Sequence, residues 1–597
     1  MGGSMIPVRW RASGWFLAVL VCLPAMVPTL LPGWFEGHDD LHIYRLVEYD
    51  LALKDGQIPP RWFPDVSAGY GNPHPIYYAP LFYVTAELFH LAGAGVILSL
   101  KGAILVFLLG AAVGMYHYAR LFFGPAASLV AAAAYTYAPY HLLDLYVRKA
   151  FSEFTVFAFI PLLLLAFHNL ALRGSRWDMI ACALAMAGMS IAHTISTMMT
   201  PALLSAYALF LSLKVIPKDV AGRWSWIGKA GVAVAIGYAI AGFFMVPAFL
   251  ERNEINLKIY TEAYVDYHKH FVYPQQLVWW PWDFGMSLPG LKDKMSFRMG
   301  LLQIAGALLS LWAVFGKPRG GAPGLTNRLH ALFFIGVTAV AVFMMIPAST
   351  AFWDMLPPLK FVQFPWRFLT LTTLSTAFLC GYAFNRLAAS RREPWSAAWA
   401  ICALFAVTAW MGGTLGVHLR VPEERVGFEE KPYNNMIDLG AAAPARPVPF
   451  DGSFVKNHTL RWLDHLPPNV SFMGLNQTDL ARPRIQVESG SGVISNLSSK
   501  SWRVSFHVEA ATQIRLRANI YRFPGWTVRV DGAEAALVEV PKQRRVIFFD
   551  VAPGSHDVEV VFERTRARWL GDLLTLAGLA ALALLGLWPR RLDARAR

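Results

Sequence analysis

Long apolar runs separated by short polar and basic segments make up most of this 597-residue chain. A helix that spans a membrane needs about 20 mostly apolar residues. Twelve segments meet this requirement, starting near residues 13, 98, 125, 152, 177, 197, 228, 297, 329, 365, 395 and 567. The first, 15–31, follows two arginines as a secretory signal would, but it lacks the small-residue cleavage pattern. The pattern predicts an all-α polytopic membrane bundle of about twelve transmembrane helices.

A thirteenth apolar segment, 77–96, is ambiguous, and the charge pattern decides its interpretation. Cytoplasmic loops carry an excess of Lys and Arg. If 77–96 lies in the membrane interface, one face receives the basic clusters Arg9/Arg11, Arg120, Arg173/Arg176, Lys214/Lys218/Arg223, Lys317/Arg319/Arg328, Arg386/Arg391/Arg392 and Arg590/Arg591/Arg595/Arg597. We therefore predict a multi-pass protein of the inner (plasma) membrane with both termini in the cytoplasm.

The period of the pattern changes between the last two predicted spans. Apolar and polar residues alternate over 503–508, 514–520, 527–530, 546–551 and 556–562, and the turn signals Asp531-Gly532 and Pro553-Gly554 lie between such runs. This predicts an extracytoplasmic β-sandwich-like domain over 418–565. The rest divides into a transmembrane domain, 1–417, with a first outer loop at 34–97, and a last transmembrane helix with a basic cytoplasmic tail, 566–597.

Composition excludes several classes of protein. With 55% hydrophobic and 15% charged residues and a mean hydropathy of +0.40, the chain is too apolar for a soluble globular protein, and 14% aromatic residues exclude disorder. The net charge of +14 lies in short clusters between spans, so it orients the chain in the bilayer and does not indicate nucleic-acid binding. The four cysteines all lie in apolar runs, which suggests neither disulfides nor a Cys-based metal site.

The first outer loop carries an acidic pair, Asp39-Asp40, directly after the first span. One interpretation is that either residue caps a helix running to about Lys54, since a carboxylate accepts backbone N–H bonds there. The other is that one of them is a general base that takes a proton from an acceptor hydroxyl. His38 and His42 raise the hypothesis of a metal site, but their spacing is unspecific and hard cations prefer oxygen ligands.

Several motifs resemble those of a known family. They are Gly56-Gln57-Ile58-Pro59-Pro60-Arg61-Trp62, Gly69-Tyr70-Gly71-Asn72-Pro73, Tyr77-Tyr78-Ala79-Pro80-Leu81-Phe82-Tyr83, Asp144-Leu145-Tyr146-Val147-Arg148-Lys149-Ala150, Gln363-Phe364-Pro365-Trp366-Arg367-Phe368, Pro524-Gly525-Trp526 and Val530-Asp531-Gly532. With these, nearly the whole chain resembles the bacterial membrane proteins labelled 6-pyruvoyl-tetrahydropterin synthase-related and their YfhO-like relatives. Those proteins are similar to the GT-C superfamily of integral membrane glycosyltransferases.

The resemblance implies a GT-C-like fold and transfer of a sugar from a polyprenyl-phosphate-linked donor to an extracytoplasmic glycan, lipid or protein acceptor, with inversion. It implies Asp39 or Asp40 as the base and leaves a divalent cation possible, with no certain cofactor. The motifs assign substrate binding to His42, Arg45, Tyr70, Tyr78, Gln363 and Trp366.

A lipid-phosphate donor stays in the bilayer, so its phosphate must meet cations where spans reach the outer interface. Four cations have such positions: Arg148, Lys149, Arg298 and Arg367. Each could instead anchor a span by snorkelling. The i,i+4 spacing would also let Asp144 pair with Arg148 and Lys149 with Glu153 on a continuous helix.

An aromatic loop, 279–282, could stack on sugar rings or belong to the interfacial belt, and Asp283 beside it is a reserve acidic residue. Two other functions remain open. A transporter or flippase for lipid-linked saccharides would place polar groups near the bilayer midplane, whereas this chain keeps most charge at span ends. A non-catalytic membrane scaffold could bind glycans through the outer β domain.

Overall fold

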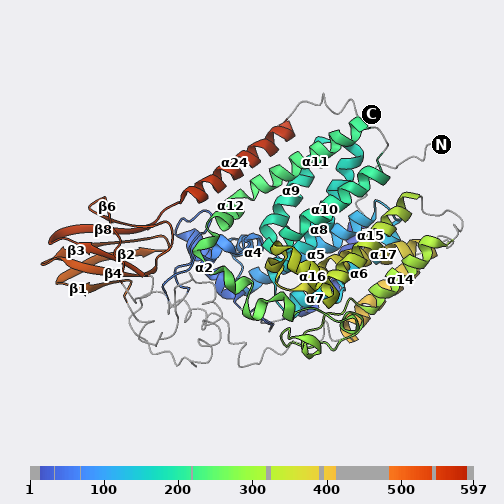
Figure 1. Ribbon diagram of the computed structural model, residues 1–597, viewed down its shortest axis with the longest axis horizontal. Helices are drawn as coiled ribbons and strands as arrows, with labels where there is room; N and C mark the ends of the chain where they lie inside the picture. Colours follow the sequence, from blue (N-terminus) through green and yellow to red (C-terminus); the bar gives the residue numbers. More distant parts are fainter. Residues whose placement is uncertain are drawn as a thin grey trace.

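The computed structural model describes residues 14–31, 34–35, 37–39, 41–66, 69–216, 220–316, 325–388, 395–411, 483–540 and 546–587. A helical bundle and a β domain lie at opposite ends of the long axis of the molecule (Figure 1). Asp40, residues 418–482 and the basic tail after Leu587 lie outside the described residues.

Each of the twelve predicted segments contains a helix. They are α1 (Gly14–Leu30), α5 (Val96–Ala119), α6 (Pro125–Thr136), α8 (Phe151–Arg173), α9 (Arg176–Ala192), α10 (Thr194–Lys214), α11 (Val220–Ile240), α14 (Leu301–Phe315), α15 (Leu325–Met345), α17 (Leu369–Leu387), α18 (Trp395–Met411) and α24 (Arg566–Leu587). Five of the described helices, α5, α8, α10, α15 and α24, are long and apolar enough to cross a membrane, and the bent pair α11 and α12 would make a sixth. A mostly helical chain with several apolar helices is thus confirmed, whereas twelve crossings stay a prediction.

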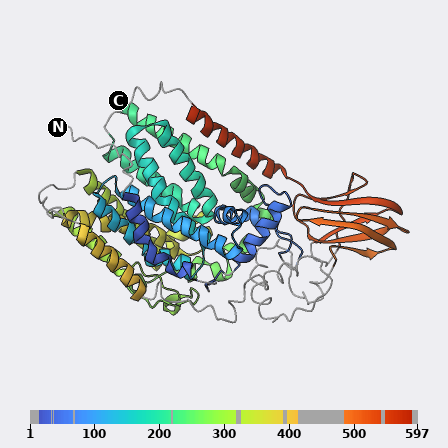
Figure 2. The ribbon, with the colours of Figure 1, turned by 180° about the vertical axis from the view of Figure 1, so that it is seen from behind.

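Short helices occupy the end of the bundle that faces the β domain. They include α2 (His42–Lys54), α3 (His74–Tyr77) and α4 (Leu81–Leu91) (Figure 1). The ambiguous segment 77–96 therefore contains a helix of only 11 residues, which is about 16 Å long and too short to span a bilayer. Figure 2, from behind, shows the N-terminal helices along the other face of the bundle.

Helices α11 and α12 (Gly242–Leu250) meet at a 75° bend, and α24 packs against it. Gly242 and Gly571 allow close approach, since a Cβ on Gly571 would lie 2.6 Å from the Gly242 carbonyl oxygen. The Phe243 N–H, which the bend frees, donates to the Thr575 hydroxyl over 2.8 Å. A buried ion pair between Arg568 and Glu251 (3.1 Å) fixes the start of α24. These contacts attach α24 firmly to the broken helix.

The C-terminal β domain consists of two antiparallel sheets. The strands are β1 (Ile485–Ser489), β2 (Gly492–Lys500), β3 (Arg503–Ala510), β4 (Ile514–Tyr521), β5 (Trp526–Val530), β6 (Ala533–Ala535), β7 (Val546–Val551) and β8 (Gly554–Phe562). One sheet has the order β1-β4-β7 and the other β2-β3-β8-β5-β6. In register, Phe506 lies opposite Val558, and Val528 opposite Val560. The five strands predicted from alternation are confirmed, and the inward-facing apolar residues of both sheets form one core.

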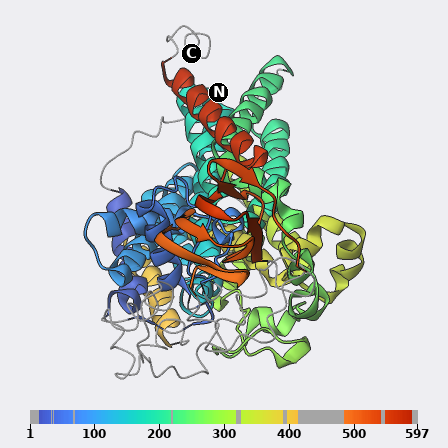
Figure 3. The same cartoon turned by 90° about the vertical axis from the view of Figure 1, so that its left-hand side faces the viewer.

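The β domain is packed onto the first loop. Trp62, Tyr70 and Ile76 of that loop are buried in the same apolar cluster as the inward-facing residues of the strands. The Trp62 ring lies 5.4 Å from Trp526, and the Tyr521 N–H donates to the Tyr70 carbonyl (2.9 Å). Figure 3, viewed from this end, shows the strands in front of the bundle. The loop and the β domain therefore share one hydrophobic core.

Gly71→Ala should loosen this packing. A Cβ on Gly71 would lie 2.2 Å from Trp62 Nε1, and its φ is +77°. Gly69 has a similar φ of +81°, and no atom of the described residues lies within 4 Å of an added Cβ there, so Gly69→Ala is a matched control for the backbone strain. We expect Gly71→Ala to lose about 1–3 kcal/mol more stability than Gly69→Ala, measured by thermal unfolding in detergent. Equal losses would show that Trp62 can move aside freely.

The predicted topology can be tested by labelling single cysteines. Thr326 at the start of α15 and Ser491 beside β2 are both exposed. After replacement of the four buried native cysteines, Thr326→Cys and Ser491→Cys should react with impermeant thiol reagents from opposite faces of the membrane, Ser491→Cys from the outer one. Labelling of both from the same face would overturn the assignment of sides.

Candidate functional site

The first loop is joined to the segment between α7 (Pro139–Tyr146) and α8 by backbone hydrogen bonds. The His38 N–H donates to the Val147 carbonyl (2.9 Å) and the Asp39 N–H to the Arg148 carbonyl (3.2 Å). Gly37 makes this approach possible, because a Cβ there would lie 2.2 Å from Lys149 Cδ. Two segments that both carry predicted site residues are thereby held side by side.

The Asp39 carboxylate lies among basic and aromatic side chains. Arg45 Nη1 donates to its Oδ2 over 3.2 Å, and His42 Nε2 lies 3.8 Å from the same oxygen. Arg45 also donates to the Tyr83 hydroxyl (3.1 Å). The Asp39 side chain remains 30% exposed. Among the described residues, the hydrogen bond and ion pairs of Asp39 involve only its Oδ2, so the partly exposed carboxylate keeps a second oxygen for a substrate.

Asp39 does not cap the following helix. Helix α2 begins at His42, its N-cap residue is Leu41, and no side-chain cap bond is present. The capping interpretation is therefore wrong for Asp39, because its carboxylate accepts from the side chain of Arg45 and not from a backbone N–H at the start of α2.

Electrostatics keep this carboxylate ionised and the neighbouring imidazole neutral. Burial opposes ionisation of Asp39, but the charges of Arg45 and other cations outweigh it and hold the pKa of Asp39 below its usual range. Burial lowers the pKa of His42 to about 3. Since His42 Nε2 lies 2.6 Å from the Lys149 carbonyl, it must donate there, and its Nδ1 accepts from the Tyr83 hydroxyl (2.7 Å). Asp39 is therefore ionised, which is the form in which a carboxylate can accept a proton.

The Arg148 side chain belongs to a buried network of ion pairs. Arg148 pairs with Asp144 and with Glu153 (3.0 Å), and Arg367 pairs with Glu153 (3.2 Å). The Tyr140 hydroxyl donates to Glu153 over 2.7 Å. The predicted Asp144–Arg148 pair is confirmed. The predicted Lys149–Glu153 pair is not formed, because Lys149 has a φ of +53° and interrupts the helix between them.

The two arginines of the network retain donors for a ligand. Among the described residues, Nη2 of Arg148 and Nη2 of Arg367 have no hydrogen-bond partner. The Arg148 guanidinium lies over the Trp366 ring (4.5 Å). The Trp366 ring also stacks with the rings of Phe297 (5.1 Å) and Phe364 (4.7 Å). Gln363 Oε1 accepts from Arg367 Nη1 (2.8 Å). The structure thus brings Arg148, Arg367, Gln363 and Trp366 together.

The other predicted cations are oriented differently. Lys149 is buried, and its Nζ donates to the Phe35 carbonyl (2.8 Å). The Arg298 guanidinium contacts the rings of both Trp279 (5.4 Å) and Trp282 (5.2 Å). Neither side chain belongs to the network of Arg148 and Arg367.

The remaining predicted residues separate into two groups. Tyr78 lies against Arg45, with its ring centroid 4.3 Å from the guanidinium carbon. Asp283 is exposed, and His38 Nε2 donates to the carbonyl of the adjacent Phe284 (2.7 Å), so Asp283 lies close to the Asp39 loop. Tyr70 lies at the β-domain interface, stacked on Tyr521 (5.2 Å), apart from the other site residues.

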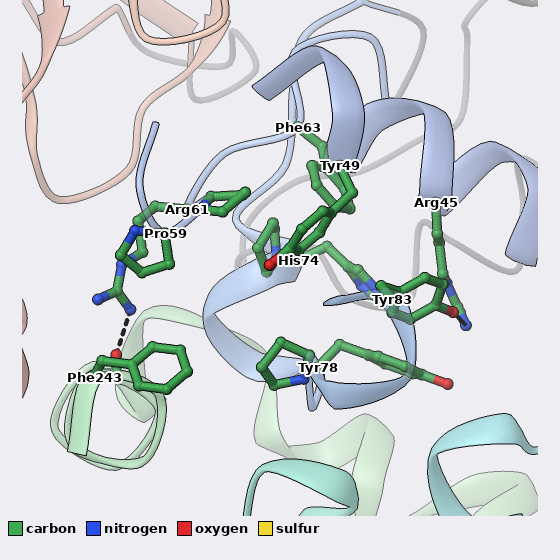
Figure 4. A pocket seen from close by; sticks show the side chains of 12 residues that line it. Arg45, Tyr49, Pro59, Arg61, Phe63, His74, Tyr78, Tyr83 and Phe243 are labelled. Atoms are coloured by element: carbon green, nitrogen blue, oxygen red, sulfur yellow. Dashed lines mark hydrogen bonds between the residues drawn. The ribbon is translucent and has the colours of Figure 1, made fainter. Parts of the chain in front are cut away.

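A small pocket opens beside Arg45 (Figure 4). Its walls are aromatic and proline side chains with two arginines, from the first loop and α12: Arg45, Tyr49, Pro59, Pro60, Arg61, Phe63, His74, Pro75, Tyr78, Pro80, Tyr83 and Phe243. Arg61 is held by the Phe243 carbonyl (2.5 Å) and Asp572 (2.9 Å). Sequence reasoning missed Tyr49, Phe63, His74 and Tyr83 as site residues, although Tyr83 stands in a quoted motif.

Within the described ranges, no three His, Cys, Asp or Glu side chains gather closely enough to hold a metal ion. Asp40 lies outside those ranges, so the described structure assigns no ligands to the possible divalent cation.

The chain matches the family model described as the 6-pyruvoyl-tetrahydropterin synthase related domain, a membrane protein, over residues 76–413. It belongs to this family of membrane proteins, as the motifs predicted. An uncharacterized protein of Lactococcus lactis subsp. cremoris (strain MG1363) is 24% identical over 275 residues, which cover 44% of this chain and 43% of that protein.

Among solved structures, the chain is similar to the arabinofuranosyltransferase AftD from mycobacteria. A mutant form aligns with a TM-score of 0.44 and 15% identity over 70% of this chain, and another structure of AftD with 0.42 and 16% over 69%. The chain spans only 29% and 27% of those proteins, and less than half of the Lactococcus protein.

Proposed function

We propose that this membrane protein is a GT-C type glycosyltransferase. It moves a sugar from a polyprenyl-phosphate-linked donor to an extracytoplasmic glycan, lipid or protein acceptor, with inversion. The observation that carries the proposal is the juxtaposition of an ionised, partly exposed carboxylate, Asp39, with Arg148 on the paired segment. In the described part of the chain, Nη2 of Arg148 and Nη2 of Arg367 have no hydrogen-bond partner. A base and a phosphate-binding group on adjacent segments are what glycosyl transfer from a lipid phosphate requires.

The proposed reaction is a single displacement. The acceptor hydroxyl attacks the anomeric carbon while Asp39 takes its proton, and the bond from that carbon to the phosphate oxygen breaks. The polyprenyl phosphate leaves with the bonding electrons. Arg148 and Arg367 donate to the phosphate oxygens as their negative charge grows, so their interaction strengthens in the transition state. Arg45 holds the carboxylate in place through its 3.2 Å hydrogen bond.

The aromatic pocket is the proposed acceptor side of the site. Arg45 and Tyr83 belong both to its wall and to the surroundings of Asp39, so the pocket lies next to the proposed base. Aromatic rings such as Tyr78 provide flat apolar surfaces for the faces of sugar rings. The β domain packs on the loop that forms this wall, which gives it a role in keeping the pocket in shape.

The test is an in vitro assay with the purified full-length protein, defined polyprenyl-phosphate sugars and a panel of acceptors, with Asp39→Asn as the inactive control. Formation of a glycosylated acceptor by the wild type alone supports the proposal. Movement of the donor across vesicle membranes without transfer would favour a transporter. Glycan binding by the β domain with neither activity would favour a scaffold.

A further inference from the structure

Three side chains of the first loop link the Asp39 carboxylate to the backbone that follows α7. Arg45 Nη1 donates to Asp39 Oδ2 (3.2 Å) and to the Tyr83 hydroxyl (3.1 Å). The Tyr83 hydroxyl lies 2.7 Å from His42 Nδ1, and His42 Nε2 lies 2.6 Å from the Lys149 carbonyl. A continuous chain of four hydrogen bonds therefore joins the carboxylate to that carbonyl.

The direction of each hydrogen bond in this chain is fixed. A carbonyl can only accept, so His42 Nε2 carries the imidazole proton. Burial lowers the pKa of His42 to about 3, so the ring is neutral and its Nδ1 accepts the single proton of the Tyr83 hydroxyl. The Tyr83 oxygen then has only lone pairs to offer, and it accepts from Arg45 Nη1. The two hydrogens of Nη1 are thus divided between Tyr83 and Asp39.

The chain closes a ring with the backbone bond between the two segments. The Asp39 N–H donates to the Arg148 carbonyl (3.2 Å), and the carbonyl at the far end of the chain belongs to the next residue, Lys149. The backbone and the side chain of Asp39 are therefore both held against the segment that carries Arg148. This ring fixes the position of the proposed base relative to that arginine.

The middle of the chain is buried. His42 is 0% exposed and Tyr83 is 4% exposed. The His42 ring packs on Phe151, with 4.2 Å between the ring centroids. Both ring nitrogens of His42 are engaged by protein groups. This environment suits His42 to holding its neighbours in place and not to contact with a substrate.

We infer that His42 and Tyr83 are positioning residues for the base. They fix the orientation of the Arg45 guanidinium, so that it binds Oδ2 of Asp39. Among the described residues, the hydrogen bond and ion pairs of Asp39 involve only Oδ2, so Oδ1 is the oxygen that takes the proton of the acceptor hydroxyl. The inference rests on the proposed function for the role of Asp39 as a base.

Tyr83→Phe removes the hydroxyl and keeps the ring. Arg45 Nη1 then loses one of its two acceptors, and His42 Nδ1 loses its donor. We expect kcat to fall about tenfold, the scale of one lost hydrogen bond. The KM of the donor should stay unchanged, because the proposed phosphate contacts are made by Arg148 and Arg367.

Tyr135→Phe is the matched control. Tyr135 is also buried, and its hydroxyl donates to the Phe157 carbonyl (3.0 Å), outside this chain. The control variant should lose a similar amount of stability on thermal unfolding and keep the wild-type kcat. A general loss of stability is thereby distinguished from a displaced base.

The titration of the Asp39 carboxyl can be measured without any substrate. Infrared difference spectra between each protein and its Asp39→Asn counterpart isolate the carboxyl band of this residue. Burial raises the pKa of Asp39, but the charge of Arg45, followed by those of His42 and Lys149, lowers it below its usual range. Releasing Arg45 weakens this effect, so Tyr83→Phe should move the midpoint upward. The control variant should leave the midpoint in place.

His42→Phe tests the other end of the chain. The new ring can still pack on Phe151, and the Lys149 carbonyl keeps the Phe151 N–H as a donor (2.9 Å). Because both residues act through one chain, His42→Phe should lower kcat by the same factor as Tyr83→Phe, and the double variant should lose no more than either alone. Losses that multiply in the double variant would overturn the chain. If Tyr83→Phe does not fold, His42→Phe takes its place in the infrared titration.

The infrared titration separates this inference from the proposed function. A midpoint raised in Tyr83→Phe, with no sugar transfer by the wild type, would support the chain and contradict the glycosyltransferase. Sugar transfer by the wild type, with a midpoint that is unchanged or lowered in Tyr83→Phe, would overturn the positioning role and leave the proposed function standing. A variant that raises only the KM of the donor would also overturn it, because Tyr83 would then act on binding.

Discussion

Asp39→Asn should reduce turnover by at least about a hundredfold, the scale expected when a general base is lost. The amide can still accept the hydrogen bond from Arg45 Nη1, which now spans 3.2 Å to Oδ2, so expression and folding should survive. The measurement is the rate of sugar transfer at saturating donor, with thermal unfolding to confirm that the variant is intact. Because the backbone N–H of Asp39 still donates to Arg148, the loop should keep its position.

Asp40→Asn is the matched control and should reduce turnover less. Wild-type turnover in both variants would exclude the acidic pair as the base, and Asp283, close to the same loop through Phe284 and His38, would become the next residue to test.

The same carboxylate predicts how transfer depends on pH. The pKa of Asp39 lies below its usual range, and a base works only above its pKa. Transfer should therefore remain nearly constant on acidification from neutral pH to about pH 5, well above the ordinary aspartate pKa of about 3.9. His42, with its pKa at about 3, stays neutral over that interval. A loss of activity with a midpoint near pH 6 would point to a different base.

Periodicity along the chain was sufficient to predict the long apolar helices and five of the eight described strands. The twelve apolar segments contain helices and the five alternating runs are strands, because each pattern reflects contacts between neighbouring turns or alternate residues. The i,i+4 spacing of Lys149 and Glu153 gave a wrong prediction of an ion pair. The i,i+4 rule assumes a continuous helix, and the chain between α7 and α8 leaves the helical conformation at Lys149.

Long-range contacts could not be predicted from the sequence. The acidic loop and the 147–149 segment were each recognised as carrying site residues, but their pairing depends on two backbone hydrogen bonds between residues more than a hundred positions apart. The contact of Trp62 with Trp526 joins residues that are even further apart in the sequence. Tyr70 was assigned to substrate binding with Tyr78 because they lie in nearby motifs, whereas the structure separates them: Tyr78 lies at Arg45 and Tyr70 under the β domain.

Arg367→Ala should weaken binding of the lipid-phosphate donor and product. Loss of a charge-assisted hydrogen bond costs about 1.5–3 kcal/mol, or about ten- to a hundredfold in affinity. Arg367→Lys should recover only part of the lost affinity. Lysine keeps the charge, but it lacks the planar guanidinium, in which Nε donates to Glu153 while Nη2 remains available for the phosphate. Removing Arg367 leaves Glu153 paired with Arg148, so the fold should tolerate the change. The measurement is binding of polyprenyl phosphate, alongside turnover.

Arg148→Ala should have the same effect on binding and a second effect on stability. Its guanidinium pairs with both Asp144 and Glu153, which are 0% and 1% exposed, and an uncompensated buried carboxylate typically costs about 3–5 kcal/mol. Thermal unfolding should therefore separate Arg148→Ala from Arg367→Ala, while product binding should not. Arg298→Ala is the comparison, since its guanidinium contacts the rings of Trp279 and Trp282 and its loss should affect binding less. Unchanged product affinity in both the Arg148 and Arg367 variants would make these arginines span anchors and move the phosphate site toward Arg298 and Lys149.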